Sequence, residues 1–382
     1  MTSPATDGEP LGWRAIGAAR DFRFAGTPRE IERFGSGHIH DTFAVRCDGP
    51  GGSRRYVLQR INARVFREPV RVVENAVRVS EHLRRRLESS GAPDADRRSL
   101  HWCESHAGGH VHRDESGSVW RACDLIEKTH TRDVVESPDE ARAAGRAFGD
   151  FLAQVADLDP GSLHTVIPGF HDLAGYARRL DAAHAADARG RARACADEVQ
   201  AVRRALAELG SARAAHESLP RRVVHADCKV NNVLLDDRSG EGVCVIDLDT
   251  VMSGRSADDF GQLARGAACT AAEDERDLSR VRFDLALFEA LCEGFLAGCG
   301  SLLSPAERAA LPQAPVLSAL EHAVRFLTDH LEGDVYFRVH RSGQNLDRAR
   351  AQRRLLEAMR ACERETARIV RSAARRGEIN RP

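Results

Sequence analysis

Residues 223–265 read VVHADCKVNNVLLDDRSGEGVCVIDLDTVMSGRSADDFGQLAR. Their pattern predicts a strand, a hairpin and a return strand, with acidic side chains on both sides of the hairpin. Turn-forming residues fill positions 236–242, and the apolar run Val243–Ile246 then delivers Asp247 and Asp249. Carboxylates placed beside apolar strands need a partner or a function, because burying them alone is costly.

The spacing H-x-D-x-x-x-x-N, followed fifteen residues later by an aspartate, suits phosphoryl transfer from ATP. Asp227 would orient the attacking hydroxyl and accept its proton. Lys229, two residues further on, would neutralise charge on the moving phosphoryl group. Asn232 and Asp247 would hold the Mg²⁺ ions that bridge the phosphates. Asp249 either helps to bind the metal or accepts backbone N–H groups at the end of its strand.

Length and composition limit the protein's class. A chain of 382 residues has room for two lobes, and 56 Lys and Arg against 57 Asp and Glu argue against nucleic acid or a membrane surface as the partner. We expect no transmembrane helix and no signal peptide. The ten cysteines include no C-x-x-C pair, so we expect a cytoplasmic protein with reduced thiols. The sequence does not indicate an oligomeric state.

A glycine-rich turn lies near the start of the chain. Strands are predicted over residues 30–34 and 43–47, on either side of a turn that contains Gly35, Ser36 and Gly37. Backbone N–H groups of such a turn can cover phosphates. The turn alone would equally suit a plain hairpin, but the motif downstream favours a nucleotide-covering loop.

The next strand, residues 55–61, is where protein kinases carry a lysine paired with a glutamate of the following helix. Here Gln59 takes that place, and the helix predicted over residues 69–83 carries Glu74. Arg60 should point to the opposite face of the strand. Either another cation serves the phosphates or a neutral amide suffices. We expect Gln59 to face the nucleotide, with Glu74 hydrogen-bonded near it and no ion pair between them.

A change of pattern marks the boundary between the lobes. Short strands over residues 99–102 and 119–123 end at Asp124–Glu127, where a kinase-like chain crosses between lobes and meets the adenine edge, so Glu127 is assigned to the nucleotide. Helical patterns then follow over residues 137–155, 172–180, 192–207, 278–296, 317–331 and 346–370. The predicted domains are a flexible lead-in (1–20), an N-lobe (21–126) and a C-lobe (127–382).

Taken together, the motifs resemble a known family. HADCKVNN with VIDLD resembles the aminoglycoside phosphotransferase and choline kinase superfamily. The segments FGSGHIHDTFAV, YVLQRIN, VIDLDTVMSG, DDFG, IPGFH, RFLTDHLEGDVYF and QNLDRARAQ resemble N-acetylhexosamine 1-kinases. The resemblance implies an α+β, bilobal protein-kinase-like fold. It has a small antiparallel-sheet N-lobe with one helix and a larger, mostly helical C-lobe.

The resemblance also implies roles for matching residues. Asp227 would be the catalytic base and also contact the acceptor, whereas Arg325 and Tyr336 match positions that contact the sugar. His38 and Asp41 would close over the same pocket. The chain departs from the family pattern near this pocket, which leaves the identity of the sugar open. The departures are His40, Ala226, Cys228, Ser253 and Gln262.

The predicted function is transfer of the ATP γ-phosphate to a sugar hydroxyl, the anomeric one of an N-acetylhexosamine or a related hexose. The alternative keeps the reaction and changes the acceptor to a cyclitol, an aminocyclitol or another polyol. A nucleotide-binding pseudokinase is a third hypothesis. It is supported only by the missing strand lysine, and the intact Asp227, Asn232 and Asp247 argue against it.

Overall fold

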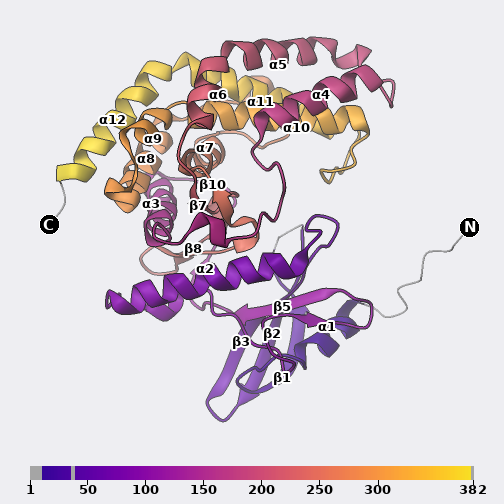
Figure 1. The fold of residues 1–382 in the computed structure, drawn as a ribbon, viewed down its shortest axis with the longest axis vertical. Coiled ribbons are helices and arrows are strands. Elements are labelled where there is room, and N and C mark those ends of the chain that lie inside the picture. The colour runs from indigo at the N-terminus through magenta and orange to yellow at the C-terminus, as the bar shows by residue number, and fades with distance from the viewer. Residues whose placement is uncertain (1–10, 36–38, 380–382) are drawn as a thin grey trace, which may run out of the picture. The chain divides into compact units, whose positions relative to one another are not determined.

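The computed structural model of the protein describes residues 11–35 and 39–379. The fold is α+β, with an antiparallel sheet in the N-terminal part and a larger, mostly helical C-terminal part (Figure 1). The chain forms two compact units. Unit 1 comprises Met1–Thr129, Gly161–Ile167 and Ile246–Met252; unit 2 comprises His130–Pro160, Pro168–Val245 and Ser253–Pro382.

Unit 1 is built on a five-stranded antiparallel sheet of order β1-β2-β3-β5-β4. Alternate residues of β2 turn Phe43, Val45 and Cys47 into the core, as the period of a strand requires. The elements of this unit are α1 (Leu11–Ala19), β1 (Thr27–Arg33), β2 (Asp41–Gly49), β3 (Gly52–Arg60), α2 (Pro69–Ser89), β4 (His112–Arg113) and β5 (Val119–Asp124).

Two helices of unit 1 differ in how well the sequence predicted them. In α2, Val72, Ala76, Val79 and Leu83 are buried at the predicted helical spacing. In contrast, residues 11–19 form helix α1, although the sequence analysis placed them in a flexible lead-in. The buried face of α1 consists of alanines, which pack against the sheet but give a weak hydrophobic signal.

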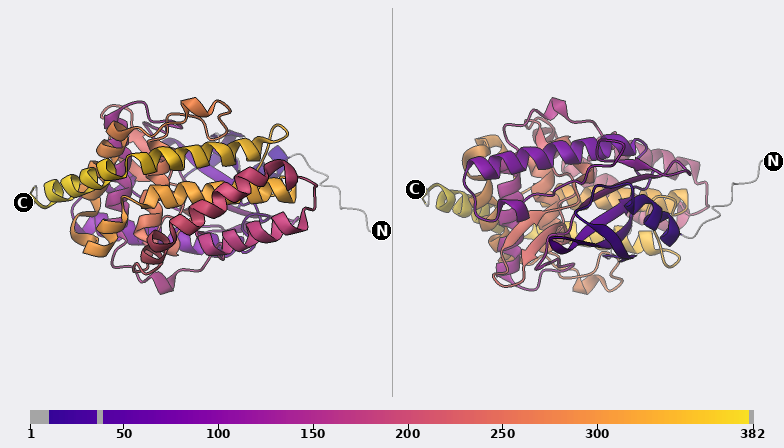
Figure 2. Two further views of the ribbon diagram at one scale, coloured as in Figure 1. Left: turned by 90° about the horizontal axis from the view of Figure 1, so that it is seen from above. Right: turned by 90° about the horizontal axis from the view of Figure 1, so that it is seen from below.

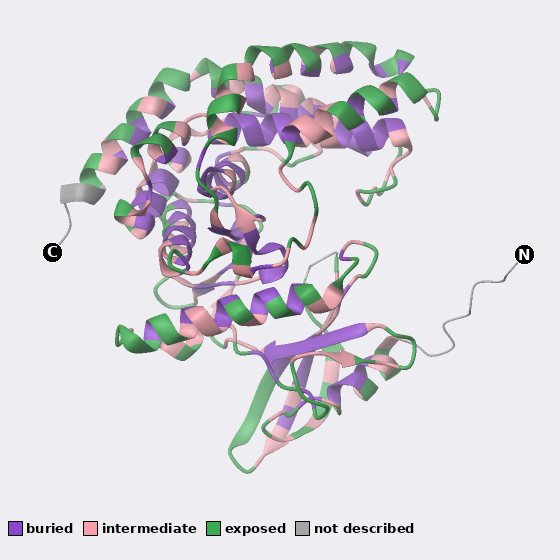
Figure 3. Cartoon of the chain, in the orientation of Figure 1, coloured by how far each residue is buried: buried purple, intermediate pink, exposed green. Residues whose placement is uncertain are grey.

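Unit 2 is assembled around α10, which is buried along most of its length (Figure 3). Helices α4 and α11 pack on it, and α5 completes this cluster (Figures 1 and 2). The helices are α3 (Pro138–Gln154), α4 (Leu173–Ala186), α5 (Ala196–Glu208), α6 (Gly210–Glu217), α7 (Ser256–Ala267), α8 (Leu285–Cys299), α9 (Pro305–Ala310), α10 (Ala314–Glu332), α11 (Gln344–Ala361) and α12 (Glu363–Ile379). The pattern predicted over residues 346–370 is therefore two helices, divided at Cys362.

The hairpin predicted from the sequence is present. Strand β8 pairs antiparallel with β9, and Val233 lies opposite Val245. Asn232 directly precedes β8, and Asp247 follows β9 by two residues, so both come from the same end of the hairpin. The short strands of this part of the chain are β6 (Thr129–His130), β7 (Arg222–Val224), β8 (Val233–Asp236), β9 (Gly242–Val245) and β10 (Met252–Gly254).

Helices α3 and α8 meet through glycines on both partners. A Cβ atom at Gly145 of α3 would overlap the Leu291 carbonyl oxygen, and one at Gly294 of α8 would overlap that of Arg142. Within the described residues, the window Leu285–Leu302 is long and apolar enough to cross a membrane. The burial of α8 against α3 accounts for this composition, because its large side chains lie in the core of unit 2.

This contact predicts a large effect from one methyl group. We expect Gly145→Ala to lower the free energy of unfolding by about 2 kcal/mol or more, since backbone atoms of α8 cannot move aside cheaply. Gly266→Ala in α7 is the matched control, because its Cβ meets no atom within 4 Å. It should raise stability by about 0.5–1 kcal/mol. Urea titration measures both, and equal effects would contradict the tight contact.

Candidate active site

The loop between β7 and β8 carries the predicted catalytic residues of unit 2. The Asp227 N–H donates to His225 Nδ1 at 3.3 Å, and Asn232 Nδ2 donates to the Asp227 carbonyl oxygen at 2.9 Å. Lys229 Nζ lies 2.8 Å from Asp227 Oδ2. The Asp227 side chain is partly exposed, so its carboxylate is fixed at the base of the loop and open to a ligand.

A buried carboxylate holds this loop in a strained conformation. Ala226 has φ 63°, a left-handed backbone that costs a non-glycine residue roughly 1–3 kcal/mol. Asp259 accepts the N–H groups of His225 and Ala226 at 2.8 and 2.7 Å and is almost fully buried. Burial raises its pKa. His225 is buried against the rings of Phe148 and Phe151, which confirms a structural role for this histidine and a bracing role for Asp259.

A buried ion pair leads from the same loop to α10. His171 Nε2 donates to the Ala226 carbonyl oxygen at 2.9 Å, and its Nδ1 lies 3.1 Å from both oxygens of Glu321. Burial lowers the pKa of His171, but the charge and hydrogen bond of Glu321 outweigh it and raise the pKa to about 9. Burial likewise opposes the ionised form of Glu321, yet His171 lowers its pKa to about 2. The Gln262 amide nitrogen donates to the same Ala226 carbonyl oxygen at 3.0 Å.

The predicted acceptor residues Arg325 and Tyr336 lie together. Arg325 is one helical turn from Glu321, and its Nη1 is 3.3 Å from Glu321 Oε1. Its guanidinium lies 5.9 Å from the centre of the Tyr336 ring. Only 12% of the Arg325 side chain is exposed, whereas Tyr336 is 51% exposed. Three more rings surround the guanidinium at 5.2–5.5 Å, those of Phe170, Tyr176 and Phe337.

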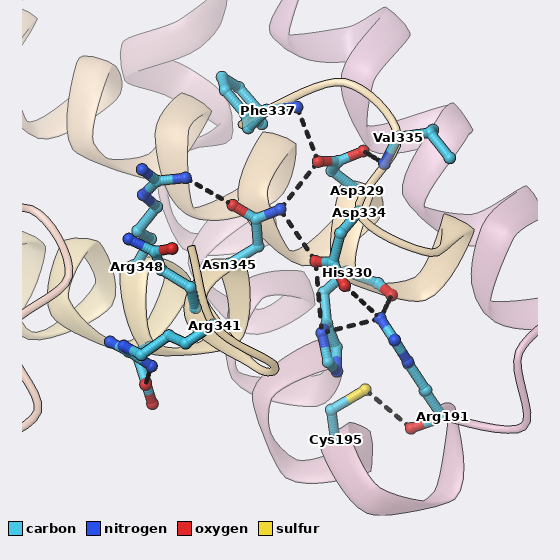
Figure 4. Close-up of polar contacts among 12 residues, drawn as sticks. Arg191, Cys195, Asp329, His330, Asp334, Val335, Phe337, Arg341, Asn345 and Arg348 are labelled. Atoms are coloured by element: carbon cyan, nitrogen blue, oxygen red, sulfur yellow. Dashed lines mark hydrogen bonds and ion pairs between the residues drawn. The ribbon is translucent and has the colours of Figure 1, made fainter. Parts of the chain in front are cut away.

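A second buried carboxylate fixes the segment that carries Tyr336. Asp329 accepts the backbone N–H groups of residues 335–337 at 2.8–2.9 Å. The Asn345 amide donates both to Asp329 and to Asp334, at 2.8 and 2.9 Å, and closes the network (Figure 4). Glu321, Arg325 and Asp329 are spaced by four, so they form one polar stripe on α10.

In unit 1, part of the predicted nucleotide-covering turn can be described. Gly35 has φ 77°, a left-handed conformation that suits glycine at a turn. Ser36, Gly37 and His38 lie outside the described residues.

Two predicted ligand-binding side chains of unit 1 have protein partners instead. The Asp41 carboxylate accepts from Arg60 at 2.6 Å and pairs with Arg33 at 3.3 Å. The Glu127 side chain pairs with Arg55 at 2.8 Å. Both acids therefore neutralise neighbouring arginines. The sequence could not indicate these pairs, because the two partners lie on different strands or on a strand and a loop.

The hydrogen-bond partners of Gln59 differ from the predicted ones. Its amide oxygen accepts from Arg121 Nε at 3.0 Å, and its amide nitrogen donates to Thr42 at 3.2 Å. Glu74 does not approach it. Glu74 is instead half-exposed and pairs with His164 at 2.9 Å. The expected hydrogen bond near Gln59 is thus wrong, because this helix position faces away from the sheet.

Asp249 has neither of the roles that the sequence left open. One of its carboxylate oxygens contacts Arg121 Nη1 and the other contacts His40 Nε2, and the side chain is buried. Burial opposes ionisation, but Arg121 and His40 hold the pKa of Asp249 well below its usual range. Assignment of Asp249 to the metal is corrected accordingly. Asp247, in a left-handed conformation with φ 62°, stays the candidate metal ligand of this segment.

Comparison with known proteins agrees with this architecture. The model of the family described as "APH: Phosphotransferase enzyme family" matches residues 30–295. The chain belongs to this family. It is a small-molecule phosphotransferase of the aminoglycoside phosphotransferase and choline kinase superfamily.

Solved structures share the fold of this phosphotransferase at low sequence identity. An aminoglycoside phosphotransferase from Alicyclobacillus acidocaldarius is 14% identical, with 99% of this chain and 98% of that chain covered and a TM-score of 0.55. A spectinomycin phosphotransferase, solved with ADP and spectinomycin, is 12% identical over 92% and 98%, with a TM-score of 0.53. A Plasmodium vivax ethanolamine kinase is 10% identical over 85% and 81%, with a TM-score of 0.51.

Several residues of these networks in the phosphotransferase were not predicted from the sequence. His171 lies in the segment IPGFH, and Asp329 and Asn345 lie in RFLTDHLEGDVYF and QNLDRARAQ, yet none was given a role. For Asp329 the available signal was a charged residue inside an apolar helix. Arg121, in the middle of Val119–Cys123, is another example.

The His171–Glu321 pair predicts a defined pH dependence of stability. Because the folded pKa of His171 is raised from 6.5 to about 9, its contribution is complete below 6.5 and disappears as the pH rises through 9. Glu321 contributes fully above 4.5. We expect His171→Gln to lower the free energy of unfolding by about 3 kcal/mol near pH 6, and by much less near pH 9.5.

Chemical denaturation at the two pH values measures the difference. His164→Gln is the control, because its partner Glu74 is half-exposed and their pair should contribute little at either pH. A His171→Gln effect that is the same at both pH values would contradict the buried ion pair.

Proposed function

We propose that this phosphotransferase transfers the γ-phosphate of ATP to a hydroxyl of a sugar, the anomeric hydroxyl of an N-acetylhexosamine or a related hexose. The observation that carries the proposal is the chain of contacts in unit 2 from Tyr336 through Arg325, Glu321 and His171 to the carbonyl oxygen of Ala226. It links the residues matched to sugar binding with the residue next to Asp227.

The roles of the reacting groups follow from their chemistry. Asp227 accepts the proton of the acceptor hydroxyl, and Lys229, already 2.8 Å from it, offsets negative charge during transfer. The oxygens of Asn232 and Asp247 fit Mg²⁺, and both residues come from one end of the β8–β9 hairpin. When bound, Mg²⁺ neutralises the phosphates. Gly35 and Gln59 are proposed to face the nucleotide.

Charge supports a neutral acceptor. The charged group nearest Tyr336 is the Arg325 guanidinium, 5.9 Å from the centre of its ring. A cation at this position disfavours a polycationic aminoglycoside there. The exposed Tyr336 offers a hydroxyl and a ring face, which suit a sugar that has both polar edges and an apolar face. A cyclitol shares these features and is the second acceptor class.

A panel of acceptors tests the proposal. ATP consumption with Mg²⁺ is measured with N-acetylglucosamine, N-acetylgalactosamine, unmodified hexoses, cyclitols and an aminoglycoside. We expect turnover with an N-acetylhexosamine and a loss of about 10²–10⁴ in kcat for Asp227→Asn. The control is Asp237→Asn, because Asp237 is an exposed residue of the hairpin that pairs with His130. This variant should keep the wild-type kcat. Turnover with cyclitols alone would overturn the proposal of a sugar acceptor. Turnover with none of the acceptors would overturn the proposed kinase activity.

Tyr336 gives a sharper test of the acceptor site than Arg325, whose removal would leave Glu321 without one of its buried partners. We expect Tyr336→Phe to raise KM for the acceptor by about 5-fold and to leave KM for ATP unchanged, because a lost hydrogen bond to a neutral group costs on the order of 1 kcal/mol. Steady-state kinetics with each substrate varied measures both constants. An equal rise in both would remove Tyr336 from the acceptor site.

A further inference from the structure

Unit 1 contains a buried cluster that anchors the segment with Asp247 to the sheet. Arg121 of β5 is 2% exposed and reaches Asp249, which lies two residues after Asp247. The same guanidinium donates from Nε to Gln59 of β3 at 3.0 Å. Gln59 and Arg121 are register partners in the sheet, so the two strands present both side chains together.

A histidine completes the cluster. The Nδ1 atom of His40 accepts the backbone N–H of Asn62 at 3.0 Å, so its proton is on Nε2, the atom that contacts Asp249. The ring stacks on Phe66 with centroids 5.6 Å apart, which fixes its orientation. One oxygen of Asp249 therefore contacts His40 Nε2, and the other forms an ion pair with Arg121 Nη1.

Arg121 is enclosed by three partners. Its guanidinium lies over the ring of Trp102 at 5.0 Å, and its edges face Asp249 and Gln59. A buried cation with these partners is held by the protein and does not extend towards a nucleotide phosphate. Its charge instead balances the carboxylate of Asp249, and neither side chain could be buried alone without a large desolvation cost.

The neighbouring backbone is fastened in a second place. Asn75 of α2 is buried and donates to the Val251 carbonyl oxygen at 2.9 Å. Asp247, in its left-handed conformation, thus lies in a segment of unit 1 whose residues 249 and 251 are bound to β5 and α2. Only Leu248 separates Asp249 from Asp247, so the anchored residue lies next to the metal-binding candidate.

We propose that Arg121 is a positioning residue that acts through Asp249 to set the metal-binding geometry of Asp247. In protein kinases a strand lysine and a helix glutamate form the ion pair behind the nucleotide. Here Gln59 replaces the lysine, and the buried cation is moved to the adjacent strand and paired with the metal-binding segment. The inference rests on the proposed function only in assigning Mg²⁺ to Asp247.

The test measures nucleotide binding, so it needs no acceptor. Calorimetric titration with ATP is carried out with Mg²⁺ and with EDTA. Residues that orient a metal ligand typically contribute 10–100-fold to metal affinity. We expect Arg121→Met to weaken binding of Mg-ATP at least 10-fold and to change metal-free ATP binding less than 2-fold. Arg46→Met is the control; this β2 arginine pairs with Glu30 and Asp48 and should behave as wild type.

A double variant separates positioning from simple stability. Arg121→Met leaves a buried carboxylate unpaired and could unfold the protein, whereas Arg121→Met/Asp249→Asn removes both charges and should fold. Thermal melting checks this. We expect the folded double variant still to lose the effect of Mg²⁺ on ATP affinity. If either folded variant bound Mg-ATP with wild-type affinity, the positioning role of Arg121 would be overturned and the proposed function would not. A wild-type protein that binds no nucleotide would overturn the proposed function as well.

Discussion

The arrangement of the catalytic loop depends on one interaction, the acceptance of two adjacent backbone N–H groups by Asp259. The left-handed conformation of Ala226 is costly for alanine, and a flexible loop would relax out of it. Asp259 reverses this preference because it is buried and finds its hydrogen bonds only in that conformation. The direction of Asp227 therefore follows from a residue of α7 that is distant in sequence.

Each unit uses buried charge in the same way. In unit 2, Glu321 is balanced by His171 and Arg325; in unit 1, Asp249 is balanced by Arg121 and receives a hydrogen bond from His40. Such networks are expensive to desolvate and stable only when every group is paired, so they tolerate little movement. That rigidity suits a site in which the protein contributes mainly position and electrostatics, as phosphoryl transfer requires.

Much of the fold could be predicted from local pattern. The hairpin of β8 and β9, the apolar face of α2 and the Ser137 cap of α3 all follow from residue spacing. Helix α1 could not be predicted in this way, because its buried face is made of alanine. The motif predicted roles for Asp227, Asn232 and Asp247, but it could not show that Asp249 pairs with Arg121. Such pairs join strands and loops far apart in the chain, and no periodicity records them.

Asp259→Asn is the sharpest test of this brace, because the amide has a single oxygen acceptor and is nearly isosteric with the carboxylate. With Mg-ATP and the acceptor that the wild-type enzyme uses, kcat should fall by about 10²–10⁴, as for loss of the base itself. Both KM values should stay within about threefold, since the variant alters the loop and not the binding groups. A folded Asp259→Asn enzyme with wild-type kcat would contradict the account, because Asp227 would then be positioned without its brace.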